Sequence, residues 1–193
     1  MPRIGLTSAR VTEAAADLAD EVGLEQVTLA ALAQHFGVAT PSLYTHVRSQ
    51  ADVRVRVALL ALEETADRVA AALAGVSGRE ALAAAGGVWR AYATEHPGRY
   101  AATRLPLDAE TAAASAGPRH ADLSRAALRG YHLSDADEVH AVRMLGATFH
   151  GYAALDAAGA FGHTGAGAPT SDETFERVLD GLHATFTSWE TLR

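Results

Sequence analysis

The sequence predicts an all-α protein of about nine helices, and three observations support this fold class. Apolar residues recur at intervals of three and four along most of the chain, which is the spacing of one face of an α-helix. No segment alternates apolar and polar residues in the way of a half-buried strand. Hydrophobic residues make up 49% of the 193, which is enough for the core of one domain or two small ones.

The first expected helix begins at Thr7 or Ser8 and ends at Val22. Gly23 follows, and glycine readily takes the backbone conformation that stops a helix. The side chains expected to be buried form one stripe along this helix: Val11, Ala14, Ala15, Leu18, Ala19 and Val22.

Residues 27–47 predict two short helices joined by a glycine turn. Thr28 can cap the first of them, and Gly37 supplies the turn because a glycine accepts a positive φ at little cost. Thr40 is expected to cap the second helix, with Pro41 at the first helical position, where its missing N–H costs nothing. The apolar face of the first helix consists of Leu29, Leu32, Ala33 and Phe36.

The second short helix is expected to have an apolar inner side and a polar outer side. Leu43 and Val47 face inward on the helical spacing. The residues left pointing outward are Ser42, Tyr44, Thr45 and His46. This arrangement is typical of a helix-turn-helix, whose second helix presents polar side chains to the major groove of DNA.

At these positions the chain resembles the TetR family of transcriptional regulators. The matching run is Gly37, Val38, Thr40, Ser42, Leu43, Tyr44 and His46. The resemblance covers residues 7–57 closely, and beyond them it extends only to the order and length of the helices. It implies a regulator that binds a double-stranded DNA operator.

The resemblance also implies roles for individual residues in DNA binding. Tyr44 and His46 match positions that contact phosphates in the family, and Thr28 can offer a phosphate its hydroxyl and the N-terminus of the helix that it caps. Thr40, Pro41, Ser42 and Thr45 match positions that touch base edges. Two departures weaken the pattern. Ala30 stands where many members have arginine or another polar residue, and Gln50 stands where a lysine usually opens the next helix. Arg48 is expected to replace that lysine in part.

A long helix over residues 50–74 is expected to connect a helix-turn-helix domain, residues 1–49, to a second domain, residues 50–193. Ser49 with Asp52 makes a capping pair for it, and it has apolar residues on more than one face. Residues 108–118 lack an apolar stripe and are expected to form an exposed loop. The remaining helices are expected at about 79–96, 99–105, 119–130, 135–158, capped by Ser134, and from Ser171, the expected cap of the last helix.

The second domain is the expected site of a small apolar or aromatic effector, because helices with large side chains among many alanines can leave a cavity. The candidate residues, which are bulky or have a polar tip, are Trp89, Tyr92, Tyr100, Met144, Phe149 and His150. By family resemblance the eighth and ninth helices form a homodimer interface. The stripe from Phe175 to Trp189 is moreover too apolar to leave exposed.

Composition excludes several other classes of protein. There is no cysteine, no HExxH motif and no legible catalytic triad, so we expect no enzyme, cofactor or metal site. No apolar run is long enough to span a membrane and no signal-peptide core is present, which favours a cytoplasmic protein.

The sequence therefore predicts a homodimeric repressor that a ligand releases from a palindromic operator. Residues 1–57 contain five arginines and six acidic residues, a net charge of −1, which is low for a DNA-binding domain. Two alternatives stay open for that reason: a helical sensor with weak DNA affinity, and a constitutive regulator without an effector.

Overall fold

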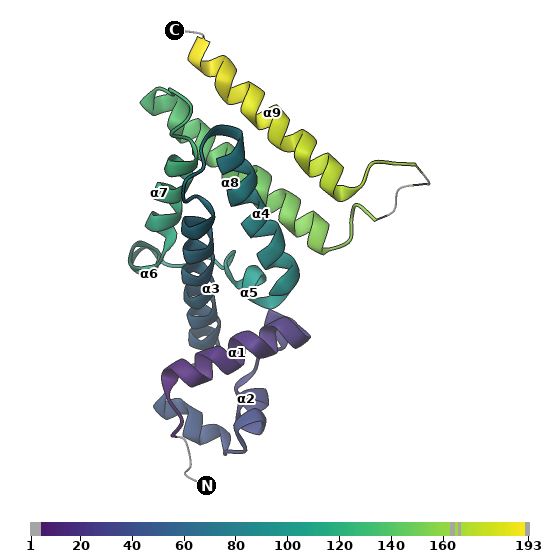
Figure 1. Ribbon diagram of the computed structural model, residues 1–193. Coiled ribbons are helices and arrows are strands. Elements are labelled where there is room, and N and C mark those ends of the chain that lie inside the picture. The colour runs from purple at the N-terminus through teal and green to yellow at the C-terminus, as the bar shows by residue number, and fades with distance from the viewer. Residues whose placement is uncertain (1–4, 163–164, 166, 192–193) are drawn as a thin grey trace. The chain divides into compact units, whose positions relative to one another are not determined.

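The computed structural model describes residues 5–162, 165 and 167–191, and every regular element in that part of the chain is helical. The predicted all-α fold is therefore confirmed (Figure 1). Helices α1 to α9 are α-helices, and η1 and η2 are 3₁₀ helices. Their bounds are α1 Ser8–Val22, η1 Leu24–Gln26, α2 Leu29–Phe36, η2 Thr40–Thr45, α3 Gln50–Ala72, α4 Gly78–Glu95, α5 Pro97–Ala102, α6 Ala109–Ala114, α7 Gly117–Ala127, α8 Asp135–Ala157 and α9 Ser171–Thr191.

The chain forms two compact units, and neither is a continuous stretch of sequence. The first unit combines the chain up to Glu64 with residues 96–115, and the second combines residues 65–95 with the chain from Ala116 onward. Helix α3 thus contributes its first part to one unit and its last part to the other. The predicted functional boundary after residue 49, with α3 as the connector, stays a prediction.

The first unit is built around the buried stripe of α1. Val11, Ala15 and Ala19 have no exposed surface, and they pack in one core cluster with residues from η1, α2, η2 and α3. Thr7 caps the helix by accepting a hydrogen bond from the N–H of Arg10 at 3.2 Å. Val22 was expected in this stripe, but half of its side chain is exposed. It lies at the last turn, beyond the residues that α1 buries.

Helix α5 completes the first unit although 31 residues of the second unit, 65–95, precede it in the chain. Ala102 belongs to the same core cluster as α1. Asp20 accepts hydrogen bonds from the N–H of Arg99 at 2.9 Å, and its other oxygen lies 3.0 Å from Nδ1 of His96. The Arg99 guanidinium also pairs with Asp17 and, at 3.1 Å, with Glu64. These contacts bind α5 to α1 and to the first part of α3.

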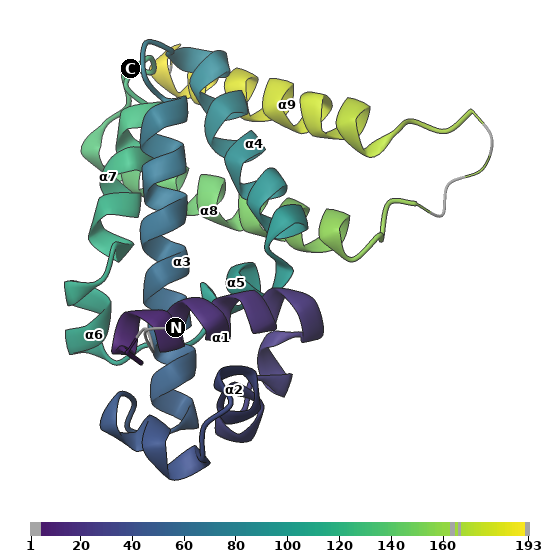
Figure 2. The same cartoon turned by 60° about the horizontal axis from the view of Figure 1, so that its bottom comes forward.

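The second unit packs α4 against α7, α8 and α9. Figures 1 and 2 show α8 and α9 lying side by side in an antiparallel arrangement. The stripe of α9 is buried inside the protomer: Phe175, Leu179, Leu182 and Phe186 are each at most 4% exposed. The expectation that this stripe must be covered by a second subunit is therefore wrong, because α4 and α8 of the same chain already cover it.

Two local predictions also need correction. Residues 109–114 form helix α6 where a loop was expected, because Asp108 caps it by accepting the N–H of Thr111 at 2.9 Å. None of its residues is buried, so no apolar stripe marks it in the sequence. At α9, Thr170 rather than Ser171 is the cap. Thr170 and Glu173 each accept the other's backbone N–H, at 3.2 and 2.7 Å.

Candidate functional site

Helix α2, the turn after it and η2 form a helix-turn-helix in the first unit. Thr28 caps α2 by accepting the N–H of Ala31 at 3.1 Å. Gly37 ends α2 with φ 63° and ψ 34°, in the left-handed region that glycine adopts without a steric penalty. Leu43 is fully buried and Val47 is 2% exposed, so η2 is fixed to the core by its inner side, as predicted.

The outer side of η2 presents polar side chains and one aromatic ring. Tyr44 is 58% exposed, and Pro41, Ser42 and Thr45 are exposed as well. Thr40 is half-buried and His46 is half-buried. The predicted cap at Thr40 is wrong. Ala39 has the extended backbone that precedes η2, and no side chain caps it. Because Thr40 is already inside the helix, its hydroxyl is not used as an N-terminal cap.

Two helix starts lie in the sequence on either side of η2. The first N–H groups of α2 follow Thr28 and have no acceptor within the helix, which makes this end suited to a phosphate. Ser49 accepts the N–H of Asp52 at 3.1 Å at the start of α3, and Asp52 accepts the N–H of Arg48 at 2.9 Å. The predicted capping pair is confirmed. Gln50 is the first residue of α3 and is half-buried.

Most of the positive charge of the helix-turn-helix region is already paired. Arg54 contacts Glu25 through an ion pair of 2.9 Å and donates to its carbonyl at 2.8 Å. Arg56 pairs with Asp52 at 3.0 Å. Partial burial acts to raise the pKa of Asp52, but hydrogen bonds from the Arg48 N–H and the Arg56 guanidinium outweigh it and lower that pKa. Arg48, whose side chain is exposed, is left as the arginine best placed for a phosphate.

The second unit contains a small enclosed cavity of about 20 Å³. It is mostly apolar, with the side chains of His120 and Ser124 as its polar lining. The residues around it are Val69, Ala85, Trp89, His120, Leu123, Ser124, Ala127, Leu145 and Phe149. Its volume is about what one water molecule requires, so the cavity is closed to a larger molecule in this conformation.

The predicted effector residues fall around this cavity only in part. Trp89 and Phe149 line it. His150 lies beside Trp89, with 4.4 Å between the ring centroids, and is not among the lining residues. Tyr92 is fully buried with the Arg68 guanidinium 5.0 Å from its ring centre, and Met144 is half-buried on α8.

Tyr100 is separated from the other predicted effector residues, because it belongs to the first unit. It is 3% exposed there, with the Arg104 guanidinium 5.1 Å from its ring centre. Burial raises the pKa of its hydroxyl, although Arg104 acts in the opposite direction. The sequence interpretation grouped Tyr100 with Trp89 on residue type alone.

Two polar residues of this region were missed by sequence reasoning. The Oγ1 atom of Thr65 lies 3.2 Å from Nε2 of His120. Thr65 is fully buried. It lies three residues after Leu62 and four before Val69, which is the spacing of one helix face. A polar residue between apolar residues on one helix face is a signal from which sequence analysis could have identified Thr65. His120 lies in the helix expected at 119–130, and nothing in the sequence distinguishes it from the other polar residues there.

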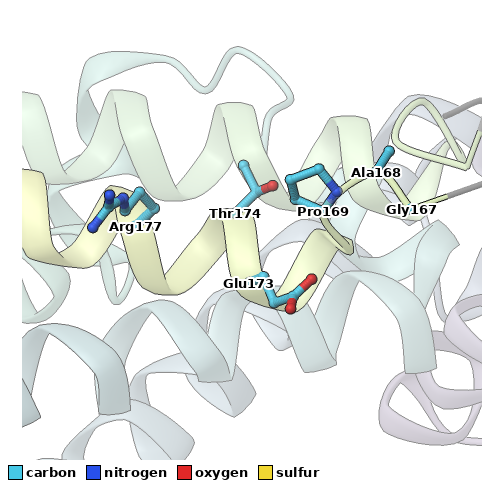
Figure 3. Close-up of a pocket in the computed structure, with 6 residues that line it drawn as sticks. All are labelled: Gly167, Ala168, Pro169, Glu173, Thr174 and Arg177. Carbon is cyan, nitrogen blue, oxygen red and sulfur yellow. The ribbon is translucent and has the colours of Figure 1, made fainter. Parts of the chain in front are cut away.

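A larger but open groove lies at the start of α9 (Figure 3). Its volume is about 480 Å³, and it is lined by Gly167, Ala168, Pro169, Glu173, Thr174 and Arg177. Effector sites usually enclose most of the ligand surface. We therefore regard the closed cavity beside Trp89 as the better candidate, although it is much smaller.

The described part of the chain shows neither a metal centre nor a membrane segment. No three or more histidine, aspartate or glutamate side chains gather there in a way that could hold a metal ion. Nor does any described helix combine the length and the apolar character needed to cross a bilayer.

The buried inner side of η2, its polar outer side and the all-helical second unit define a helix-turn-helix DNA-binding protein. Comparison with known families agrees with this class. The family model "Bacterial regulatory proteins, tetR family" matches residues 11–57, and "Tetracyclin repressor-like, C-terminal domain" matches residues 82–182. The chain belongs to the TetR family of transcriptional regulators.

Two curated relatives are similar over most of their length. The uncharacterized HTH-type transcriptional regulator YobS of Bacillus subtilis (strain 168) is 30% identical over 160 residues, which are 83% of this chain and 84% of the relative. The uncharacterized HTH-type transcriptional regulator Rv0681 of Mycobacterium tuberculosis is 32% identical over 158 residues, 80% of this chain and 72% of the relative. The relatives are thus transcriptional regulators and not enzymes.

Solved structures share the fold. TetR-Q116A from Acinetobacter baumannii AYE, in complex with minocycline, has a TM-score of 0.71 at 22% identity. The match covers 96% of this chain and 99% of that one. At this level of identity the likeness shows the fold alone.

Proposed function

We propose that this protein is a homodimeric repressor that binds a palindromic operator and leaves it when a small molecule binds the second unit. The observation that carries the DNA-binding part is η2 itself. One fully buried leucine, Leu43, fixes the helix, and its polar residues and Tyr44 face outward where a major groove could receive them.

We assign the DNA contacts by type. Tyr44 on η2 and His46, which directly follows η2, would hold phosphates, and Arg48 would add an exposed guanidinium. Thr28 and Gln50 stand at the starts of α2 and α3, where backbone N–H groups can also meet phosphates. The residues proposed to meet base edges are Thr40, Pro41, Ser42 and Thr45.

The dimer would form through the outer faces of α8 and α9, since their inner faces are buried within the protomer. On α8, Leu155 is 51% exposed and Val139 is 43% exposed. Side chains built at Gly146, Gly151 and Gly181 would meet nothing within 4 Å, so these faces have room for the close approach of a second subunit. The family's dimeric assembly supports the same surface.

The effector would act by a population shift with α3 as the connector. The TetR of Acinetobacter baumannii AYE, which shares this fold, is in complex with minocycline, and this supports a small-molecule effector for the present chain. One conformation of the dimer places its two recognition helices so that they do not fit successive major grooves of DNA. A ligand that binds this conformation more tightly lowers the affinity for the operator. To reverse a 99:1 preference, it must bind that form about 5.5 kcal/mol more tightly.

Selection of bound DNA fragments from a random pool tests the proposal, followed by a salt titration on the selected palindrome. We expect log affinity to fall linearly with log salt, because each phosphate contact releases counterions. Arg48→Ala should reduce that slope by about 0.9 for each subunit bound. Arg54→Gln is the matched control and should leave the slope unchanged, because Glu25 already holds Arg54.

The two rival functions give different results in the same experiments. A sensor that does not recognise DNA would select no palindrome and show no steep salt slope. A constitutive regulator would select a palindrome, yet no compound from a metabolite screen would both raise its melting temperature and release the DNA.

A further inference from the structure

We propose that the cavity beside Trp89 takes a compact aromatic alcohol and rejects charged ligands, with His120 recognising the polar group of the ligand and Thr65 holding His120 in place. This inference rests on the proposed effector response and specifies the chemistry of its site. It moves the polar contact from His150, the residue expected from the sequence, to His120 of α7, which the fold places beside Thr65 of α3.

The size of the cavity limits the ligand to a small one. At about 20 Å³ the cavity admits a ring only if a wall moves. Trp89 is 9% exposed and has two imidazoles beside it, with 5.2 Å to His120 and 4.4 Å to His150 between ring centroids. Helix α7 is the wall that moves with least loss of burial, since within this fully described helix Ala127 alone is buried.

The polar groups of the cavity favour a ligand with one hydrogen-bonding tip. The hydroxyl of Thr65 is in a fully buried side chain, 3.2 Å from Nε2 of His120. Ser124 donates a hydrogen bond to the carbonyl of His120 at 2.9 Å, which holds this turn of α7 in place. Thr65 does not line the cavity, so its role is to hold His120. A neutral imidazole donates at one nitrogen and accepts at the other, so His120 suits a ligand hydroxyl group.

The charge of the cavity disfavours a cationic ligand. The nine residues that line it include no aspartate and no glutamate. An ammonium group would therefore lose its water without gaining a counter-charge, which is costly in an apolar site. Attraction of a cation to the face of Trp89 is weaker than this cost.

Four probes of one ring size test this selectivity: toluene, benzyl alcohol, benzoate and benzylamine. A ligand that binds only the folded protein raises its melting temperature by mass action. At one common concentration, benzyl alcohol should raise the melting temperature more than toluene, whereas benzoate and benzylamine should not raise it, because the cavity lining has no counter-charge for either. His120→Leu should reduce the benzyl alcohol shift to that of toluene while the toluene shift persists.

Two variants of the cavity wall locate the binding site. Ala127→Leu fills the cavity and should abolish the shifts by all probes, whereas Leu145→Ala enlarges it and should increase the toluene shift. Ala91→Leu is the control, because Ala91 is exposed on α4 and does not line the cavity. If Ala127→Leu does not fold, Leu145→Ala and His120→Leu still test whether the probes bind in this cavity.

The proposal is overturned if benzylamine matches benzyl alcohol, if a folded Ala127→Leu keeps the shifts, or if neither the wild type nor Leu145→Ala responds to any probe. Failure of the ligand chemistry is distinct from failure of the proposed function. If other metabolites release operator DNA while these probes do not bind, only the chemistry assigned to the cavity is wrong. If no operator is selected, the proposed function itself fails.

Discussion

Gly98 lies directly against the backbone carbonyl of Ala19, so closely that a Cβ atom on Gly98 would be 2.0 Å from that oxygen and 2.6 Å from the N–H nitrogen of Asp20. The same carbonyl accepts the hydrogen bond from Gly23 that ends α1. Helix α5 can therefore reach the core of the first unit only because position 98 has no side chain.

Gly98→Ala should consequently destabilise the first unit. An added methyl group would have to push apart two backbone segments, and overpacking of this kind costs about 1–3 kcal/mol or more. Chemical denaturation measures the change. Gly87→Ala is the matched control, since its Cβ would meet nothing within 4 Å. That change should add about 0.5–1 kcal/mol of stability, as expected inside a helix. Equal effects of the two substitutions would contradict the close approach.

Tyr44→Ala should weaken DNA binding with little loss of stability. The side chain is 58% exposed, so its removal leaves the core intact. Loss of one hydrogen bond to a charged phosphate corresponds to about 1.5–3 kcal/mol for each half-site. Fluorescence anisotropy on several operator variants should show the same loss on all of them, because a phosphate contact does not read sequence. A loss confined to one base would assign Tyr44 to base recognition instead.

The proposed dimer surface makes neighbouring residues of α9 respond differently to arginine. Gly181 is exposed, so Gly181→Arg should give a folded monomer in place of a dimer of about twice 20.1 kDa. Leu182 is 4% exposed within the protomer, so Leu182→Arg should destabilise the fold by burying an unpaired charge. Light scattering gives the mass and circular dichroism the fold. A folded dimer of Gly181→Arg would place the interface elsewhere.

Asp156→Asn tests a charged network that fixes the end of α8 and the start of α9 to α4. Arg90 donates to Oδ2 of Asp156 at 2.7 and 2.9 Å, and Ser171 donates to its other oxygen at 2.6 Å. Partial burial acts to raise the pKa of Asp156, but the hydrogen bonds from Ser171 and Arg90 outweigh it and lower that pKa. Hydrogen bonds to a charged group typically contribute about 1.5–3 kcal/mol, which is the expected loss of stability at neutral pH.

The pH dependence of that loss has a definite sign. Because the folded protein lowers the pKa, the carboxylate's contribution is fully present above its unfolded pKa of about 3.9 and is lost as the pH falls through the lower folded value. The stability difference between the wild type and Asp156→Asn should be constant above about pH 5 and should shrink below about pH 4. Asp172→Asn is the control. Asp172 also contacts Arg90, but its side chain is 87% exposed, so little change is expected.

The sequence by itself determined the all-α fold, the bounds of the long helices and the helix-turn-helix. These features depend on local spacing: Thr28 and Gly37 delimit α2, and Leu43 and Val47 lie one helical turn apart on the buried side. Local order also determines the outward residues of η2. The position of a helix cap, however, depends on the backbone conformation of a single residue. The sequence interpretation placed two caps one residue too late, at Thr40 and Ser171.

Only the tertiary structure decided which distant segments meet. The joining of α5 to α1 depends on a glycine that touches a carbonyl 79 positions earlier, and no periodicity reports such a contact. The stripe of α9 has the same pattern whether a second subunit or the protomer's own α4 and α8 cover it. His120 and Thr65 lie 55 positions apart, and their pairing depends on the packing of α7 beside α3. Helical spacing identifies which side of a helix is buried, whereas the partner of that side depends on packing across the whole unit.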